Sequence, residues 1–276
     1  MNPPNVRNWL PRSGKARASV AIVHGFGEYG GLYSEVAEFL AAHRSSVVCR
    51  DLRGHGLSPG RRGNIQGWSD YREDVADMVG RLRRAAPELP VFLLGNSMGG
   101  LIAADYAIHH SDELSGLILL APAVGEIGVP AFLLRLSRLL SSIWPTFTMK
   151  SGIERSRLTR DPAAIARLDA DPLVHSLGTA RLGSEMQDAI ARVKQQAPEL
   201  TLPVLVLQGE ADQVTSPDST REFFENIGAS DKTLKTYPGA LHNLIIDLVK
   251  DDVMRDMDTW IARRSPGKTS LPPAPE

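Results

Sequence analysis

Short apolar runs alternate with longer amphipathic stretches along most of the chain. The apolar runs are almost uninterrupted, which is typical of strands buried on both faces of a parallel sheet. They lie at Ser19–Val23, Ser46–Cys49, Val91–Leu94, Leu117–Leu120, Val204–Leu207 and Thr233–Tyr237. Helical spacing follows at Tyr33–His43, Trp68–Ala86, Leu101–His110, Ser216–Ile227 and Asp251–Arg263. Strand followed by helix, repeated, predicts an open, twisted and mostly parallel α/β sheet with helices on both faces.

The alternation stops between about residues 123 and 200. This segment has no clear strand, and helices are predicted at Pro130–Ser142, Asp161–Asp169 and Gly178–Gln196. We therefore expect a core formed by residues 1–122 and 201–264, with a helical cap of residues 123–200 inserted between two strands. Residues 265–276 are rich in Pro, Ser, Gly and Lys, which predicts a disordered tail.

Charge and cysteine content narrow the possible classes of protein. The 31 basic and 32 acidic residues nearly balance, so no nucleic-acid partner is expected. Cys49 is the single cysteine, and its apolar neighbours favour an inert buried thiol over a nucleophile. With no signal-like N-terminus and no long uncharged apolar stretch, we expect a soluble cytoplasmic protein. The oligomeric state is left open.

The most informative motif is Gly95-Asn96-Ser97-Met98-Gly99, which lies between a predicted strand and a predicted helix. Gly-x-Ser-x-Gly in this context is typical of a nucleophilic serine on a strained turn. The two glycines let neighbouring backbone pass without a Cβ clash, and the helix start offers free N–H groups near the serine. The sequence therefore predicts Ser97 as a nucleophile. The competing interpretation is a chance motif in which Ser97 only caps the helix.

A serine hydroxyl needs a general base, and the base needs an orienting acid. On this kind of fold the chain order is serine, acid, histidine. The loop after Val204–Leu207 offers Asp212, with Glu210 as the rival, and we favour Asp212 because it lies beyond the strand end. His242 is the only histidine after Asp212 and is the predicted base; His175, in the insertion, is the weaker alternative.

An oxyanion hole needs two backbone N–H donors. The N–H of Met98, next to the nucleophile, is one candidate. The loop His24-Gly25-Phe26-Gly27 follows an early predicted strand, and Phe26 is our choice for the second donor.

Taken together, these motifs resemble the monoacylglycerol lipase and lysophospholipase branch of the α/β-hydrolases. The resemblance runs from about Val20 to Ile261. It rests on segments 24–30, 51–58, 95–100, 171–173 and 209–212, which read HGFGEYG, DLRGHGLS, GNSMGG, DPL and GEAD. The resemblance implies a mostly parallel eight-stranded sheet with a helical cap over the active site.

Three features depart from that branch. Asn96 stands where the family usually has histidine, and Asn243 stands where glutamate is common. Both flank the predicted triad, so substrate preference is in question while the triad is not. The N-terminus is also short for the family's opening hairpin, so one edge strand is expected to be missing.

The predicted cap helix, residues 130–144, carries an apolar stripe that includes Phe132, Leu133, Leu136, Leu139 and Ile143. Such a stripe packs on the core, lines an acyl-chain pocket, or meets a membrane or lipid surface. The hypothesis is a serine hydrolase of single-chain lipid esters such as monoacylglycerols, without metal or organic cofactor. Gly25, Glu28, Asn96, Leu133 and Leu136 are the expected substrate contacts.

The alternatives within enzymes are a short-chain carboxylesterase, a lysophospholipase or a thioesterase, and the same fold also hosts peptidases, lactonases and acyltransferases. The alternative outside enzymes is a catalytically silent ligand-binding relative.

Overall fold

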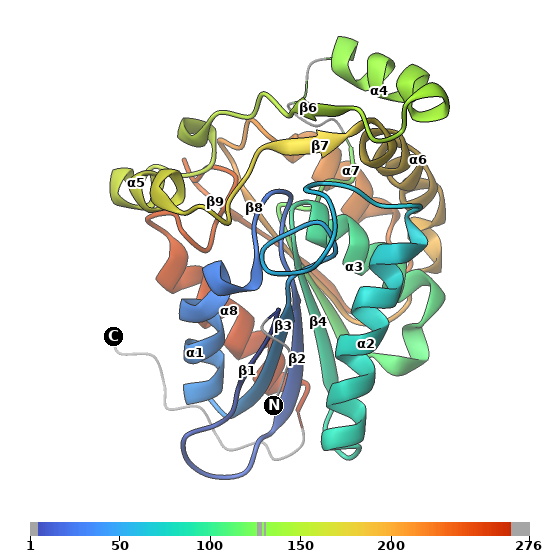
Figure 1. Ribbon diagram of the computed structural model, residues 1–276. Coiled ribbons are helices and arrows are strands. Elements are labelled where there is room, and N and C mark those ends of the chain that lie inside the picture. The colour runs from blue at the N-terminus through green and yellow to red at the C-terminus, as the bar shows by residue number, and fades with distance from the viewer. Residues whose placement is uncertain (1–4, 126–128, 130, 266–276) are drawn as a thin grey trace.

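The computed structural model describes residues 5–125, 129 and 131–265, and a seven-stranded sheet lies at its centre (Figure 1). The strands are β1 (Val6–Trp9), β2 (Ala18–Val23), β3 (Ser45–Arg50), β4 (Val91–Asn96), β5 (Gly116–Leu120), β8 (Val204–Gly209) and β9 (Lys232–Tyr237). Their order is β1-β3-β2-β4-β5-β8-β9. β1 runs antiparallel to β3, and all the other neighbours are parallel. The predicted mostly parallel sheet is confirmed.

Two hydrophobic cores form because successive side chains of a strand point to opposite faces of the sheet. In β2, for example, Val20 and Ile22 enter one core, while Ala21 and Val23 enter the other. One core is covered by α1 (Ser34–Ala42) and α8 (Lys250–Arg263), and the other by α2 (Ser69–Ala85), α3 (Met98–His109) and α7 (Pro217–Asn226). Four short 3-10 turns complete the connections: η1 (Gly30–Tyr33), η2 (Ser111–Glu113), η3 (Arg155–Arg157) and η4 (Ala197–Glu199).

The segment between β5 and β8 lies over the end of the sheet where the parallel strands terminate (Figure 1). Its longer elements are α4 (Ala131–Ile143), β6 (Thr148–Lys150), α5 (Pro162–Ala170), β7 (Leu177–Thr179) and α6 (Ala180–Gln196). The expectation of a segment without strands is wrong, because β6 and β7 form an antiparallel pair. They are only three residues each, too short to show an alternating pattern from which a strand could be predicted.

Capping residues explain where two of these helices begin. The side chain of Asp161 accepts a hydrogen bond from Ala163 N at 2.8 Å, and Pro162 occupies the first turn of α5. Thr179 Oγ1 accepts from Leu182 N at 3.3 Å at the start of α6. Each side chain satisfies one N–H group that has no partner within its own helix.

Two features differ from the prediction: the strands at the N-terminal edge of the sheet and the first residue of the predicted C-terminal tail. The described residues have seven strands in the central sheet, one fewer than the family resemblance implied. β1 was not predicted, because only four residues pair with β3 and only Val6 is buried. Ser265 was placed in a disordered tail, yet it is buried and its hydroxyl donates to Ile261 O at 2.8 Å. The rest of that predicted tail, residues 266–276, lies outside the described residues.

Candidate active site

Ser97 lies on a strained turn between the end of β4 and the start of α3. Its φ of 55° is a left-handed backbone conformation that residues other than glycine rarely adopt, and this conformation costs about 1–3 kcal/mol. The flanking glycines make the turn possible. A Cβ on Gly99 would lie 2.2 Å from Val23 O, and one on Gly95 would lie 2.3 Å from Gly99 O. This close packing of α3 on β2 and β4 holds the hydroxyl of Ser97 above the sheet.

His242 and Asp212 come from the loops after β9 and β8 and complete a hydrogen-bonded chain with Ser97. His242 Nε2 lies 2.8 Å from Ser97 Oγ, and His242 Nδ1 lies 2.8 Å from Asp212 Oδ2. An ionised carboxylate only accepts hydrogen bonds, so the ring proton belongs on Nδ1 and Nε2 is free to accept from Ser97. This is the arrangement that general-base activation of a serine requires.

The Asp212 carboxylate is buried and held on both oxygens. Oδ1 accepts from Val214 N at 2.7 Å and Thr215 N at 3.0 Å, while Oδ2 accepts from Gln208 Nε2 at 2.9 Å and Thr215 Oγ1 at 2.8 Å. Burial acts to raise the pKa of Asp212, but the His242 ring and the two N–H groups outweigh it, so the pKa lies below its ordinary value. Asp212 therefore stays ionised and aligned with His242.

The rival residues lie elsewhere. Glu210 is exposed and accepts from Thr236 Oγ1 at 2.7 Å, away from His242. His175 contacts His55, with ring centroids 4.9 Å apart, and does not reach Ser97 through any hydrogen bond of the described residues. The thiol of Cys49 is buried, and this burial raises its pKa far above the ordinary value. Neither a thiolate nucleophile nor an alternative acid is supported by the geometry.

The oxyanion loop, residues 24–28, is oriented by the His24 ring. His24 Nε2 accepts from Leu52 N at 2.9 Å, so its proton lies on Nδ1, which donates to Gly25 O at 2.8 Å. Because a trans peptide is planar, the N–H of Phe26 points opposite to the Gly25 carbonyl. Because the Gly25 carbonyl accepts a hydrogen bond from His24 Nδ1, the Phe26 N–H points away from the His24 ring. Phe26 lines both cavities that contain Ser97, as an oxyanion donor must.

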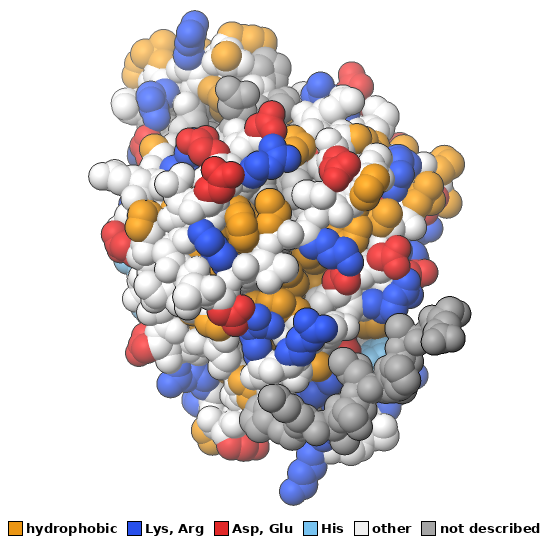
Figure 2. All heavy atoms as spheres, turned by 180° about the vertical axis from the view of Figure 1, so that it is seen from behind, with side chains coloured by type: hydrophobic (Ala, Val, Ile, Leu, Met, Phe, Trp, Pro, Cys, Tyr) orange, Lys and Arg blue, Asp and Glu red, His pale blue; other side chains and the backbone are white. Residues whose placement is uncertain are grey.

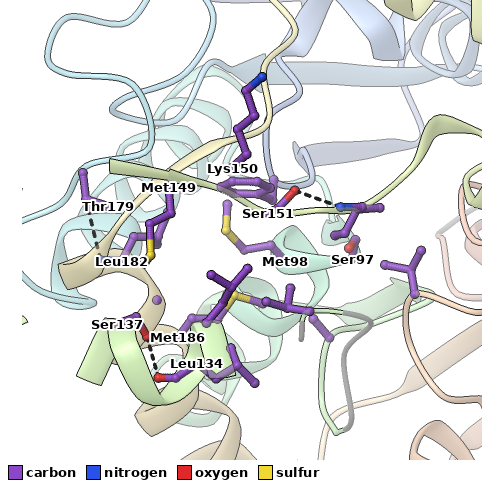
Figure 3. A pocket seen from close by; sticks show the side chains of 18 of the residues that line it. Ser97, Met98, Leu134, Ser137, Met149, Lys150, Ser151, Thr179, Leu182 and Met186 are labelled. Carbon is purple, nitrogen blue, oxygen red and sulfur yellow. Dashed lines mark hydrogen bonds between the residues drawn. The ribbon is translucent and has the colours of Figure 1, made fainter. Parts of the chain in front are cut away.

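A predominantly apolar cavity opens from Ser97 beneath α4 and α6. Its empty volume is about 780 Å³ counted out to the open mouth. Figure 3 shows Ser97 at one end and Leu134 and Ser137 of α4 at the other. The side chains of Met98 and Met186 lie between these ends, and that of Met149 lies beside Leu182 (Figure 3).

A second, more polar pocket meets the first at Ser97 and Phe26. Its empty volume is about 530 Å³. The polar side chains that line it, apart from Ser97, are Glu28, Ser151, Arg155, His175, Ser176 and His242. The hydroxyl of Ser97 thus stands between an apolar compartment and a polar one.

The predicted substrate contacts fall into two groups. Leu133 lines the apolar cavity, and Gly25 and Glu28 line the polar pocket. Leu136 lines neither and is 36% exposed. The reason is the way α4 faces α6: a Cβ on Gly183 would lie 2.8 Å from Ser137 Cβ, so small residues fill this contact and Leu136 turns outward.

Asn96, the remaining predicted contact, is fully buried behind Ser97 and lines neither pocket. Its Nδ2 lies 3.5 Å from Glu28 Oε2. Thr215 was not predicted as a site residue, yet its hydroxyl contacts both Asp212 Oδ2 and, at 3.4 Å, His242 Nδ1. Its position three residues after the predicted acid was the only available clue.

Two negative findings concern the described residues, 5–125, 129 and 131–265. No group of three or more His, Cys, Asp and Glu side chains among them is placed to hold a metal ion. None of the helices formed by these residues is both long and apolar enough to cross a membrane.

The doubly covered parallel sheet, with a serine turn after β4 and acid and histidine loops after β8 and β9, defines an α/β-hydrolase of the serine hydrolase class. Residues 14–248 match the family model described as "Serine aminopeptidase, S33". The monoglyceride lipase of Mus musculus is 34% identical over 94% of this chain and 86% of its own length. The monoacylglycerol lipase of Mycolicibacterium smegmatis is 31% identical over 92% of this chain and 90% of its own length.

Among solved structures, the Paleococcus ferrophilus monoacylglycerol lipase superposes with a TM-score of 0.87 at 30% identity. The match covers 94% of this chain and 98% of that one. The chain therefore belongs to this α/β-hydrolase family and, within it, to the branch that holds the monoglyceride lipases, as its motifs predicted.

Proposed function

We propose that the protein hydrolyses single-chain lipid esters, 1-monoacylglycerols foremost, through an acyl-enzyme on Ser97. The observation that carries the proposal is the meeting of an apolar cavity and a polar pocket at the Ser97 hydroxyl. An ester of a fatty acid with a polyol has the same division, with an apolar chain on one side of the carbonyl and hydroxyl groups on the other.

In the proposed mechanism, Ser97 Oγ attacks the ester carbonyl while His242 Nε2 takes its proton. Asp212 keeps the ring in the required tautomer and stabilises the imidazolium that forms. The N–H groups of Phe26 and Met98 bind the developing oxyanion, and His242 then protonates the leaving alkoxide as the acyl–oxygen bond breaks. Water, deprotonated by His242, attacks the acyl-enzyme, and the fatty acid leaves with Ser97 regenerated.

The acyl chain is assigned to the apolar cavity. Burying each methylene contributes about 0.8 kcal/mol, so a cavity of this kind favours longer chains until it is filled. Three methionine side chains line it, and their unbranched thioethers adapt to chains of different shape. The alcohol is assigned to the polar pocket, where Ser151, Ser176 and Arg155 offer hydrogen-bond donors.

We propose that residues 123–200 form a cap whose described residues supply part of the lining of both pockets, and that α4 is its contact with a lipid surface. The buried positions of α4 are Ser137 and Ser141, and Leu133 and Leu134 line the apolar cavity, while most of its other large apolar side chains are exposed. The exposed ones on and just after α4 are Phe132, Leu136, Leu139, Ile143 and Trp144. Figure 2 shows apolar side chains gathered at the top of the molecule, where α4 lies in Figure 1.

Such a surface favours transient contact with a membrane or a lipid droplet, from which a sparingly soluble substrate can enter. Arg135 on the same helix is also exposed and would favour an anionic surface, whereas the charge of Arg138 is offset by Asp188 at 2.7 Å.

The test of the proposed function is kcat/KM for 1-monoacylglycerols of increasing chain length, compared with short alkyl esters and an aminoacyl arylamide. We expect a rise towards medium or long monoacylglycerols, with no turnover by Ser97→Ala. Activity on short esters alone would leave a general carboxylesterase. Turnover of the arylamide alone would favour the peptidase reaction that the family description names. A wild-type protein inert to all three would support the silent ligand-binding relative.

A further inference from the structure

The Glu28 carboxylate lies where two loops of the site meet the end of strand β4. Its Oε2 accepts from Gly25 N at 2.8 Å, within the oxyanion loop, and from Tyr33 Oη at 2.5 Å. The same oxygen lies 3.5 Å from Asn96 Nδ2, next to the nucleophile. Its Oε1 accepts from Asn243 Nδ2 at 2.6 Å, next to the histidine. One side chain therefore joins the loops that follow β2 and β9 to the last residue of β4.

These contacts occupy most of the hydrogen-bonding capacity of Glu28. A carboxylate offers about four lone-pair sites, and four donors approach it here. Its side chain is almost fully buried, with 9% of the residue exposed. Glu28 is thus engaged with the protein itself, although its edge borders the polar pocket.

The contact with Gly25 bears directly on the oxyanion loop. Glu28 N also donates to Gly25 O at 3.3 Å, which closes a tight turn with Phe26 and Gly27 at its centre. Gly27 has a φ of +72°, and a Cβ there would lie 1.9 Å from His175 O, so this turn has little room to shift. The direction of the Phe26 N–H depends on this turn. Glu28 holds the turn through both backbone groups of Gly25, because its carboxylate accepts from Gly25 N and its own N–H donates to Gly25 O.

We propose that Glu28 is a positioning residue, whose buried carboxylate fixes the oxyanion loop relative to Ser97 and His242. The proposal rests on the function proposed above in assuming that Ser97 is the nucleophile, and it is independent of which ester is the substrate. It replaces the expectation that Glu28 binds the substrate. Misplacing a catalytic group by about 1 Å costs on the order of 100-fold in rate, which sets the scale of the effect.

The experiment compares Glu28→Ala and Glu28→Gln with the wild type on a monoacylglycerol and on a p-nitrophenyl ester, whose leaving group has no polyol. Glu28→Ala removes all the contacts, and we expect kcat to fall about 100-fold on both substrates, with KM changed by less than about threefold. Phosphonylation of Ser97 by a fluorophosphonate ester should slow to a similar degree, because it also builds charge in the oxyanion hole.

Glu28→Gln should recover most of the rate. Its amide oxygen can accept from Gly25 N and Tyr33 Oη, and its NH₂ group faces Asn243, whose buried Oδ1 has no partner among the residues that the structure describes and can turn to accept. We expect kcat within about tenfold of the wild type, since about one charge-assisted hydrogen bond is weakened. Thermal melting of each variant shows whether it is folded.

Asp105→Asn is the matched control. Asp105 is likewise a buried carboxylate, on α3, and it pairs with Arg72 at 3.1 Å and Arg192 at 3.3 Å. We expect this variant to lose melting temperature while kcat stays within about threefold of the wild type.

Two results would overturn the proposal. One is a folded Glu28→Ala with wild-type kcat on the p-nitrophenyl ester. The other is a loss confined to KM for the monoacylglycerol, which would make Glu28 a contact of the alcohol. If the wild type does not cleave monoacylglycerols, the proposed function fails, but the comparison on the p-nitrophenyl ester and the fluorophosphonate still decides the role of Glu28.

Discussion

At the scale of single residues, the account depends on Asp212 holding the His242 ring in one tautomer. Asp212→Asn would present an NH₂ group to Nδ1, which would then have to accept, so the ring proton would move to Nε2 and Nε2 could no longer take the proton of Ser97. We expect kcat to fall by about 10⁴, as for the same change in a related triad. The measurement is steady-state hydrolysis of a p-nitrophenyl ester. Glu210→Gln is the control, because Glu210 is exposed and hydrogen-bonded to Thr236. A comparable loss of kcat in this variant would contradict the assignment of Asp212 as the triad acid.

The residues of the proposed triad could be selected from the sequence because the serine motif and the chain order leave few candidates. Asp212 and His242 follow strands that neighbour each other in the sheet, so their loops meet. The convergence of Glu28, Asn96 and Asn243 was not predictable. Their loops follow strands far apart in the sequence, and their contacts depend on side-chain directions that no local pattern encodes.

At the scale of elements, α4 is the helix whose outward apolar face requires a partner. Leu139→Glu places a charge on that face at a position that is 63% exposed, so it should fold normally. We expect the apparent KM for micellar or vesicle-bound monoacylglycerol to rise about tenfold or more, because burial of one leucine side chain is worth about 1.5–3 kcal/mol. Hydrolysis of a soluble short ester should be unchanged.

Leu10→Glu is the control for a charge added at an exposed leucine outside the cap. If it raised the same KM equally, or if Leu139→Glu did not raise it, α4 would not be the lipid contact. The orientation of α4 was not predictable from its apolar stripe alone. The stripe is present, but the close approach of Ser137 to Gly183 decides which side of the helix faces inward.

At the scale of the whole molecule, buried neutral histidines link stability to pH. Burial lowers the pKa of His24, against the attraction of Glu28 and Asp51, and lowers that of His55 further, with the His24 and His175 rings adding to the effect. Below about pH 6.5 the unfolded chain binds protons that the folded chain excludes, so the free energy of unfolding falls as pH falls. Each such histidine contributes up to about 1.4 kcal/mol per pH unit.

The measurement is urea unfolding between about pH 7.5 and 5.5, which gives the free energy of unfolding at each pH. His55→Gln is compared with the wild type by the slope of this free energy against pH, and not by its absolute value. His55→Gln should have a shallower slope, whereas His43→Gln, at an exposed histidine, should keep that of the wild type. Equal slopes in all three would show that His55 does not exclude protons in the folded state. At this scale the parallel sheet was predictable, because its buried strands stand out as apolar runs.

The most direct test of the central claim is to find where a fluorophosphonate ester attaches. The protein would be treated to completion and digested, and the modified peptide identified by mass spectrometry while monoacylglycerol hydrolysis is followed in parallel. We predict one adduct, on Ser97, that forms at the same rate as activity is lost and does not form in Ser97→Ala. An adduct on another residue that tracks the loss of activity, or full activity with Ser97 modified, would contradict the account.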